Sequence, residues 1–353
     1  MSVSKRIHIW SSGYNNKVEM EPNSPEIKLK KRLKIGRKHK ISVIIPIFNK
    51  EDYLDECLNT VENQTLKDIE IICINDGSTD NSLNVIKEHA DKDRRVQVIN
   101  QNNMGVGKTR DKGIELSNSE FICFMDPDDY YPSDDVLETL YSVAKENRAL
   151  IAGGSWSEDH NGKIKIEFSG IYQKYIFKEN GFVDYKDYQF DYGYHRFIYD
   201  RKMIVQNNIY FPPYKRYQDP PFFVKAMITA GSFYSVTKQT YRYRYGHQKV
   251  EWKNKEVCDG LISGLIDNLR LSSEYRLGVL HKLTVDRLNN EYSKYLIDAV
   301  INEEGTELFD LIKKANNCVD RELLTSIVPE IRDNYSLPVL VKATEALNKR
   351  QTK

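Results

Sequence analysis

The 353-residue sequence has few cysteines, no long apolar run and almost no net charge. No segment approaches the roughly 20 apolar residues needed to cross a bilayer, and residues 1–10 lack the long apolar core of a signal peptide. Lysine and arginine total 52 against 51 aspartate and glutamate, so global charge does not argue for a nucleic-acid partner. We therefore expect a cytoplasmic protein that binds no nucleic acid.

The five cysteines are widely separated and show no paired spacing typical of a metal site. They are Cys57, Cys73, Cys123, Cys258 and Cys318. Cys73 and Cys123 lie in apolar runs that we expect to be buried strands, which favours a reducing cytosol over a compartment that forms disulfides.

Short apolar runs alternate with helix-like segments from residue 41 to about residue 150. The expected strands are Ile41–Phe48, Ile69–Ile74, Val96–Ile99 and Phe121–Met125. The expected helices, with apolar residues at helical spacing, are Glu51–Gln64, Leu83–Ala90 and Val106–Leu116. This alternation predicts an α/β fold with a mostly parallel sheet flanked by helices, in which ligands bind beyond the carboxyl ends of the strands.

Three of the expected strands end in residues able to contact a ligand. These segments are Phe48–Asn49, Asn75–Asp76 and Asp126–Asp128. Because carboxyl ends of parallel strands share one edge of a sheet, the segments should converge on one crevice. In an extended chain Asp126 and Asp128 point the same way, and Pro127 prevents further ladder hydrogen bonding. Two hard oxygen ligands suit Mg²⁺ or Mn²⁺ and leave coordination positions for a diphosphate.

Each acidic segment also has a purely structural interpretation. Taken alone, Asp126–Asp129 fits an acidic turn before a helix that starts near Ser133 about equally well. Residues 77–80 can form a tight turn and cap the next helix. That role does not account for Asp76, a carboxylate well placed to accept hydrogen bonds from a base or ribose.

Five ordered segments resemble the motifs of the inverting GT-A glycosyltransferases of family 2. They are Val43–Asn49, Asn63–Thr65, Asn75–Asp80, Asn103–Gly105 with Arg110, and Asp126–Asp129. The resemblance covers Ile41 to about Ser155. It implies the GT-A fold, with a Rossmann-like sheet flanked by helices, and metal-dependent transfer of a sugar from a UDP-sugar with inversion.

The resemblance also implies roles for single residues in the nucleotide site. The matched positions are Pro46, Phe48, Asn49, Glu51, Asp76, Arg110 and Asp126. Pro46, Phe48 and Asp76 resemble contacts to uracil and ribose, while the family varies at the position of Glu51. Arg110 resembles the basic residue that supports the nucleotide, and Asp126 the acidic residue on the ribose side. The alternative for Phe48 is a core aromatic.

A downstream segment, Tyr217–Phe223, resembles the part of bacterial family members that carries the catalytic carboxylate. Their usual Glu-Asp pair is Gln218-Asp219 here, so only Asp219 can serve. The resemblance makes Asp219 the base that removes the acceptor hydroxyl proton during inverting displacement. The alternative is that Asp219 caps a helix that runs from Pro220 onward.

The expected metal site centres on Asp128, which resembles the family's ligand for Mn²⁺ or Mg²⁺. Tyr241–His247 alternates like an exposed strand, and its arginines are placed to meet phosphates. A histidine in this half of the chain completes the metal shell in some GT-A enzymes, so His247 is a second candidate ligand. A surface or structural role is the alternative for a lone histidine.

Two further patterns bear on function. Tyrosine is dense between Ile171 and Tyr245, which suits carbohydrate stacking in an acceptor pocket and equally suits half-buried strands. Gly105–Thr109 ends like a phosphate-binding P-loop, but the first glycine of that motif would fall on Asn102. The dinucleotide fingerprint also fails, because its third glycine position holds Arg110.

The sequence divides into three expected parts: a basic N-terminal extension (1–40), a GT-A catalytic domain (41–252) and a helical C-terminal region (253–353). Within the catalytic domain, 41–150 is the nucleotide-sugar half and 151–252 the acceptor half. Lys28 to Lys40 is densely basic with interleaved apolar residues, which fits contact with anionic lipid or a solvated linker about equally. The helical region is expected to pack on the catalytic domain or to support homo-oligomer formation.

The sequence therefore predicts a hexosyltransferase-type glycosyltransferase that uses a UDP-sugar donor and a glycan or lipid-linked glycan acceptor. The bacterial style of Tyr217–Phe223 suggests capsule, lipopolysaccharide or related surface-polysaccharide synthesis, on the inner face of the cell membrane. Two alternatives remain: a sugar-nucleotide-binding protein without catalysis, and a P-loop NTPase.

Overall fold

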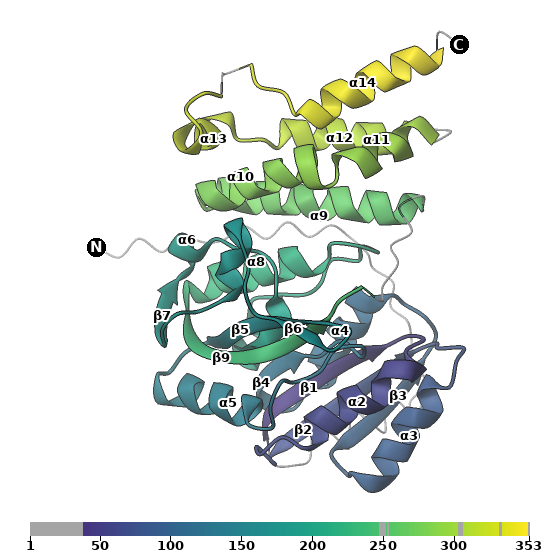
Figure 1. The fold of residues 1–353 in the computed structure, drawn as a ribbon, viewed down its shortest axis with the longest axis vertical. Helices are drawn as coiled ribbons and strands as arrows, with labels where there is room; N and C mark the ends of the chain where they lie inside the picture. The colour runs from purple at the N-terminus through teal and green to yellow at the C-terminus, as the bar shows by residue number, and fades with distance from the viewer. Residues whose placement is uncertain (1–37, 247–251, 253, 303–305, 332–333, 352–353) are drawn as a thin grey trace. The chain divides into compact units, whose positions relative to one another are not determined.

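A nine-stranded sheet forms the centre of the computed structural model, which describes residues 38–246, 252, 254–302, 306–331 and 334–351 (Figure 1). Its strands are β1 (His39–Ile47), β2 (Ile69–Asp76), β3 (Val96–Gln101), β4 (Ser119–Phe124), β5 (Ile151–His160), β6 (Lys163–Lys165), β7 (Gly181–Asp184), β8 (Phe197–Asp200) and β9 (Ser232–Arg244). The strand order is β3-β2-β1-β4-β8-β5-β9-β7, with β6 paired to β5. The β3-β2-β1-β4 half is entirely parallel, so these four strands end at the same edge.

The helices of the first half are α2 (Glu51–Glu62), α3 (Ser82–Lys92), α4 (Val106–Leu116) and α5 (Val136–Glu146). The first three, α2 to α4, connect the four parallel strands as expected, and α5 leads from β4 to β5. All residues of β2 are buried, as are residues Val43–Ile47 of β1, because helices cover the sheet. The predicted α/β class with a Rossmann-like, mostly parallel central sheet is therefore confirmed.

The second half of the sheet carries shorter elements around its mixed strands. They are η1 (Gly170–Tyr175), α6 (Tyr185–Tyr188), η2 (Tyr194–Arg196), α7 (Arg201–Gln206) and α8 (Asp219–Ala230). The expectation of an exposed strand at Tyr241–His247 is wrong for its first part, because Tyr241 is fully buried in β9. His247 lies outside the described residues, as do residues 28–37 of the basic stretch.

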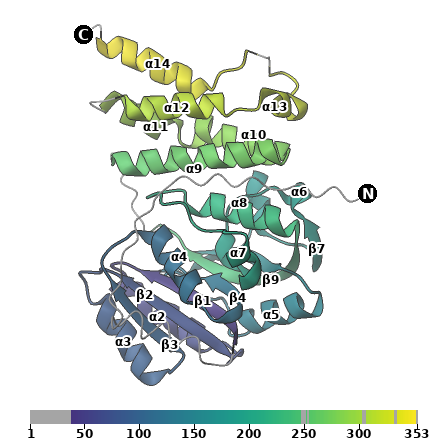
Figure 2. The same ribbon diagram turned by 180° about the vertical axis from the view of Figure 1, so that it is seen from behind.

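A helical region follows, as predicted. It comprises α9 (Lys255–Glu274), α10 (Gly278–Asp286), the π-helix η3 (Arg287–Glu291), α11 (Ser293–Asn302), α12 (Glu307–Asn317), α13 (Arg321–Ile327) and α14 (Pro338–Gln351). It has its own hydrophobic core, and α9 is its helix nearest the sheet domain (Figures 1 and 2). Across the described ranges, no helix has the length and apolar character needed to span a membrane.

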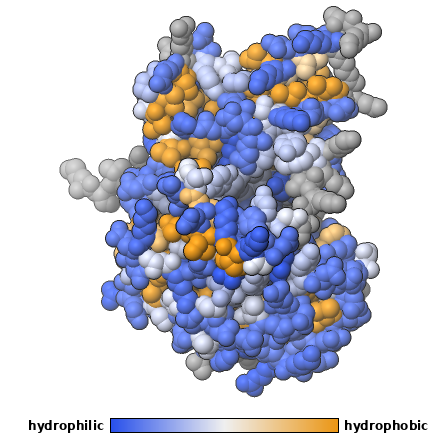
Figure 3. Space-filling model, viewed as in Figure 1, coloured by the Kyte–Doolittle hydropathy of each residue, from blue (hydrophilic) through white to orange (hydrophobic). Residues whose placement is uncertain are grey.

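The face shown in Figure 3 is mostly hydrophilic, with apolar residues gathered in separate patches. Exposed large apolar residues of the helical region include Tyr275, Ile327 and Val341. Homo-oligomer formation through these helices stays a prediction, because exposed apolar residues alone do not identify a partner.

Helix α4 packs unusually closely on β1 at Gly113. A Cβ atom added there would lie 2.3 Å from Ile44 Cγ2, and Ile44 is fully buried in β1. This contact sets the height of α4 above the sheet, and α4 carries Arg110 at its inner face.

We expect Gly113→Val to lower the free energy of unfolding by about 2 kcal/mol or more, because a side chain here overpacks the α4–β1 contact. Urea unfolding followed by circular dichroism measures the loss. Glu115→Val is the matched control: the same side chain is introduced on the exposed face of α4, where the change should stay within about 0.5 kcal/mol. Equal effects of the two variants would contradict a close contact at Gly113.

Candidate functional site

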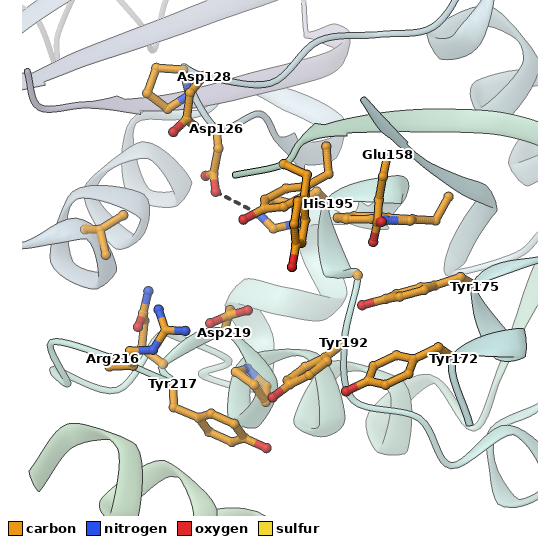
Figure 4. A pocket seen from close by; sticks show the side chains of 18 of the residues that line it. Asp126, Asp128, Glu158, Tyr172, Tyr175, Tyr192, His195, Arg216, Tyr217 and Asp219 are labelled. Atoms are coloured by element: carbon orange, nitrogen blue, oxygen red, sulfur yellow. Dashed lines mark hydrogen bonds and ion pairs between the residues drawn. The ribbon is translucent and has the colours of Figure 1, made fainter. Parts of the chain in front are cut away.

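One large pocket opens at the carboxyl ends of β1 and β4 and has a volume of about 1360 Å³. Its wall from the parallel half includes Pro46, Phe48, Lys50, Arg110, Asp126 and Asp128. Residues 215–220 also line the pocket, with Asp219 across from Asp126 (Figure 4), and its aromatic lining comprises Trp156, Tyr172, Tyr175, Tyr192, Tyr243 and Tyr292. The prediction that separate strand ends converge on one crevice is therefore confirmed for β1 and β4.

The Asp126 carboxylate is contacted by two nitrogen-bearing side chains from different parts of the chain. Arg110 Nη2 on α4 donates to Asp126 Oδ1 at 2.7 Å, and His195 Nε2 on η2 lies 3.0 Å from Asp126 Oδ2 (Figure 4). Burial raises the pKa of Asp126, but the charges of Arg110 and His195 outweigh this and hold it well below its usual range. Asp126 is therefore an ionised carboxylate at neutral pH.

Arg110 is 4% exposed and is held by more than Asp126. Its guanidinium lies 5.3 Å from the ring centroids of both Tyr194 and Phe211. Among the described residues, its Nε and Nη1 atoms have no hydrogen-bond partner. Buried donors that lack partners are costly, so their presence beside a pocket favours an anionic or polar ligand at this point.

Asp128 is 2% exposed and forms an ion pair with Lys50, whose Nζ lies 2.6 Å from Asp128 Oδ2. Lys50 therefore places a cation on the carboxylate that the sequence predicts to be a metal ligand. The neighbouring Asp129 is not free for this task, because Tyr241 Oη donates to its Oδ2 at 2.6 Å and the Arg244 backbone N–H donates to its Oδ1 at 2.8 Å. Burial, with Asp128 and Asp126 nearby, raises the pKa of Asp129.

The chemistry of the donors fits a hard divalent cation that takes most of its ligands from elsewhere. The described residues contain no group of three or more His, Cys, Asp or Glu that would hold a metal by themselves. Asp128, with Asp126 two residues away on the same turn, supplies hard oxygen donors, as Mg²⁺ and Mn²⁺ prefer. A cation bound here would need Lys50 to leave Asp128 and a diphosphate or water to fill its coordination.

Three predicted nucleotide contacts hold loops together. Asp76 accepts hydrogen bonds from the backbone N–H groups of Met104 (2.8 Å) and Gly105 (2.9 Å), and is 3% exposed. Asn49 Oδ1 accepts from the Thr79 N–H at 2.8 Å, and Glu51 Oε2 accepts from the Asn81 N–H at 2.7 Å. These bonds join the loops after β1, β2 and β3. A nucleotide contact by Asp76, Asn49 or Glu51 stays a prediction.

Pro46 and Phe48 do line the pocket. The Phe48 side chain is 46% exposed, so the alternative that it is only a core aromatic is wrong. An exposed ring at the end of β1 suits stacking on a flat base.

Asp219 is the first residue of α8 and lies across the pocket from Asp126 and His195 (Figure 4). Gln218 occupies the N-cap position, and neither it nor Asp219 makes a side-chain capping bond, so the alternative role of Asp219 as a helix cap lacks support. Within the ranges that the structure describes, the Asp219 carboxylate has no hydrogen-bond partner, although Arg110 is near enough to feel its charge. A partly exposed carboxylate facing a pocket is available to accept a proton.

The residues of this site that sequence reasoning missed include Lys50, Trp156 and His195. Lys50 directly follows the Phe48–Asn49 strand end, so its position in the motif was the available signal. His195 and Trp156 carry no motif. Trp156 stacks between Tyr175 and Tyr241, and its Nε1, like His195 Nδ1, has no hydrogen-bond partner among the described residues.

Some tyrosines of the dense segment line the pocket and others pack in the core, so both interpretations of the segment apply. Tyr172, Tyr175 and Tyr192 line the pocket, as a carbohydrate-stacking surface would require. Tyr185 and Tyr199 are buried in the hydrophobic core.

Comparisons with known proteins agree with this geometry. The family model described as Glycosyl transferase family 2 matches residues 42–205. The poly(ribitol-phosphate) beta-glucosyltransferase of Bacillus spizizenii is 30% identical over 311 residues, which is 83% of this chain and 47% of that protein. The cholesterol galactosyltransferase of Borreliella burgdorferi is 42% identical over 117 residues, 33% of this chain and 32% of that one. The chain thus spans about half or less of the length of these curated relatives.

Solved structures show the same fold. The crystal structure of S. aureus TarS residues 1–349 in complex with UDP-GlcNAc superimposes with a TM-score of 0.62 at 19% identity, covering 89% of this chain and 92% of that chain. The match includes the helical region as well as the sheet domain, because the sheet domain alone would not cover this share of the chain. The chain therefore contains a Glycosyl transferase family 2 domain at residues 42–205, and its fold is the GT-A fold.

Proposed function

We propose that this protein is an inverting glycosyltransferase that moves a sugar from a UDP-sugar to a hydroxyl of a glycan or lipid-linked glycan in surface-polysaccharide synthesis. The observation that carries the proposal is one pocket in which Asp219 faces the Asp126–Arg110–His195 group. The family domain supports sugar transfer. A relative named for poly(ribitol-phosphate) and a TarS complex with UDP-GlcNAc support a polysaccharide acceptor and a UDP-linked donor.

The proposed reaction assigns one task to each side of the pocket. Asp219 removes the proton from the acceptor hydroxyl, whose oxygen forms a bond to the anomeric carbon while the bond from that carbon to the diphosphate breaks. Phe48 stacks on the uracil, and the unpartnered Arg110 donors bind negative charge on the nucleotide. Attack from the Asp219 side, opposite the leaving diphosphate, inverts the anomeric centre.

A divalent cation, Mn²⁺ or Mg²⁺, would be held by Asp128 with Asp126 beside it, and would neutralise charge that develops on the departing diphosphate. His247, the second candidate ligand, stays a prediction. Lys50, which is paired with Asp128 in the structure, would compete with such a cation for this carboxylate.

The two alternative functions fit the pocket less well. A sugar-nucleotide-binding protein without catalysis has no need for the unpartnered Asp219 opposite the nucleotide wall. A P-loop cradles phosphate with its backbone N–H groups, but here the N–H groups of Met104 and Gly105 donate to Asp76.

The first test is turnover with a panel of nucleotide sugars and Mn²⁺, measured as released nucleoside diphosphate in the presence of a glycan acceptor. We expect a UDP-sugar to be used. Asp219→Asn should lower kcat by about 10²-fold or more, because an amide cannot take the proton, while UDP affinity by calorimetry should barely change.

Asp111→Asn is the matched control for that test. Asp111 lies on α4, and its Oδ1 accepts from the Phe211 N–H at 2.9 Å, a bond that asparagine keeps. Parental turnover in Asp219→Asn would place the base elsewhere, and ATP or GTP hydrolysis without an acceptor would favour the NTPase.

The metal role is tested through Lys50. Lys50→Met removes the cation that competes for Asp128, so Mn²⁺ should bind the UDP complex more tightly, by about tenfold if an ion pair worth roughly 1 kcal/mol or more is lost. Titration of free Mn²⁺ by electron paramagnetic resonance measures this directly. Asp128→Asn should abolish the binding. Full turnover in excess EDTA, with Lys50→Met inactive, would instead show that Lys50 itself supplies the positive charge.

Peripheral contact with the inner face of the cell membrane is proposed for the basic stretch Lys28–Lys40. Reversal of Lys28, Lys30, Lys31 and Lys34 to Glu should abolish flotation with vesicles that contain anionic lipid. Reversal of four exposed lysines elsewhere, Lys67, Lys87, Lys92 and Lys163, is the control for total charge. If both sets of reversals leave flotation unchanged, the stretch is only a linker.

A further inference from the structure

A buried ion pair joins the sheet domain to the helical region directly behind Asp219. Arg287, in the π-helix η3, is 2% exposed, and its Nη1 donates to Oδ2 of Asp191, which is 1% exposed. The same Nη1 donates to Tyr217 Oη at 2.5 Å. Tyr217 Oη in turn donates to Asp191 Oδ2 at 3.1 Å, and Asn268 Nδ2 on α9 donates to that oxygen at 2.9 Å.

The buried Arg287–Asp191 ion pair by itself is expected to add little to the free energy of unfolding. Removing two charges from water costs several kcal/mol per ion, so a buried pair is often no more stabilising than well-packed apolar side chains. A structural role for such a pair is to select one conformation of the groups that it contacts. The group that it contacts here is Tyr217, two residues before Asp219.

The backbone at Tyr217 needs external support. Its φ is +63°, a left-handed conformation that costs a bulky residue about 1–3 kcal/mol and persists only where surrounding structure holds it. The Tyr217 hydroxyl is bound by Arg287 and Asp191, and its ring packs edge-on against Tyr292 at a centroid distance of 6.3 Å. Contacts from the helical region therefore hold the strained residue.

Helix α9 supports the same segment through its backbone. A Cβ added at Gly264 would lie 2.4 Å from the Tyr217 carbonyl oxygen, and one added at Gly260 would lie 3.0 Å from the Arg216 backbone nitrogen. Only glycine permits this approach, so one turn of α9 lies directly behind residues 215–217.

The π-helix also reaches the pocket itself. Glu291 and Tyr292 line it, and Tyr292 Oη lies 2.8 Å from the hydroxyl of Tyr192, another lining residue. The Arg287 guanidinium stacks 3.6 Å from the centre of the Tyr192 ring. Single π-helical turns inside helical segments are frequent at functional sites.

We propose that the helical region is part of the active site, and that Arg287, acting through Asp191 and Tyr217, is a positioning residue for Asp219. It fixes the Tyr217–Asp219 segment so that the carboxylate faces the pocket. The inference rests on the proposed function in one respect, the role of Asp219 as the base. It assigns to α9 and η3 a part in catalysis that the family domain of residues 42–205 does not contain.

The test removes the whole ion pair. Arg287→Met alone would leave Asp191 buried without a partner and is expected to unfold or weaken the protein. The double variant Asp191→Leu with Arg287→Met leaves no unpaired charge, so it should fold with a melting temperature near that of the parent. We expect its kcat to fall by about 10²-fold, the effect of misplacing a catalytic group by about 1 Å, with UDP affinity unchanged.

Tyr217→Phe is the second variant, because it removes one hydroxyl and keeps the Asp191–Arg287 pair. Its kcat should fall by about tenfold, again with unchanged UDP affinity, since the two hydrogen bonds of the Tyr217 hydroxyl are lost from the positioned segment. His281→Phe is the matched control: His281 is fully buried in the helical region, and its hydrogen bonds go to Ser272 and to the backbone N–H of Asp320. It should lower the melting temperature and leave kcat unchanged.

Amide hydrogen exchange gives a readout that does not depend on turnover. Residues 215–219 should exchange faster in the double variant, while β1–β4 exchange as in the parent. Unchanged exchange at 215–219, or parental kcat in a folded double variant, would overturn the positioning role. Failure of the proposed function has a different result: a parent that transfers no sugar, with the exchange difference still present.

Discussion

The site depends on one largely enclosed carboxylate, Asp126, whose partners keep it ionised. Its two partners come from different halves of the fold. Arg110 lies on α4, which packs on the parallel strands, and His195 lies on η2, just before strand β8. Burial alone would raise the pKa of Asp126, and the contacts with Arg110 and His195 outweigh it, so the carboxylate remains charged. The contacts that keep Asp126 charged therefore also link α4 to η2 across the site.

The turn that follows Asp126 carries two more carboxylates, and each of them is also held by partners from another segment. Asp128 is balanced by Lys50 from the end of β1, and Asp129 is bound by Tyr241 and the Arg244 backbone from β9. Each acidic residue is thus held by a different element. Asp128 is paired with the flexible side chain of Lys50, so its carboxylate is the one best suited to exchange Lys50 for another positive ion.

At the opposite wall of the pocket, a residue of the C-terminal helices pairs with another buried carboxylate. Asp191 is a fully desolvated carboxylate whose charge is met by Arg287, and their shared partner Tyr217 holds a strained backbone beside Asp219. A region without family motifs therefore reaches the site through packing and charge. Long-range contacts of this kind leave no periodicity in the sequence, which is why residues 253–353 were predicted to be helical, with packing on the catalytic domain and self-association both left open.

The sequence by itself determined the parallel half of the fold, because β-branched apolar runs and helical spacing are local patterns. It also identified Phe48, Arg110, Asp126 and Asp219 as candidate site residues, because the family motifs occur in the same order along the chain. Only the tertiary structure decided which of the candidates share a pocket and which brace loops, as Asp76 does. The pairing of buried charges depends on distances between segments far apart in sequence, and those distances exist only once the chain has folded.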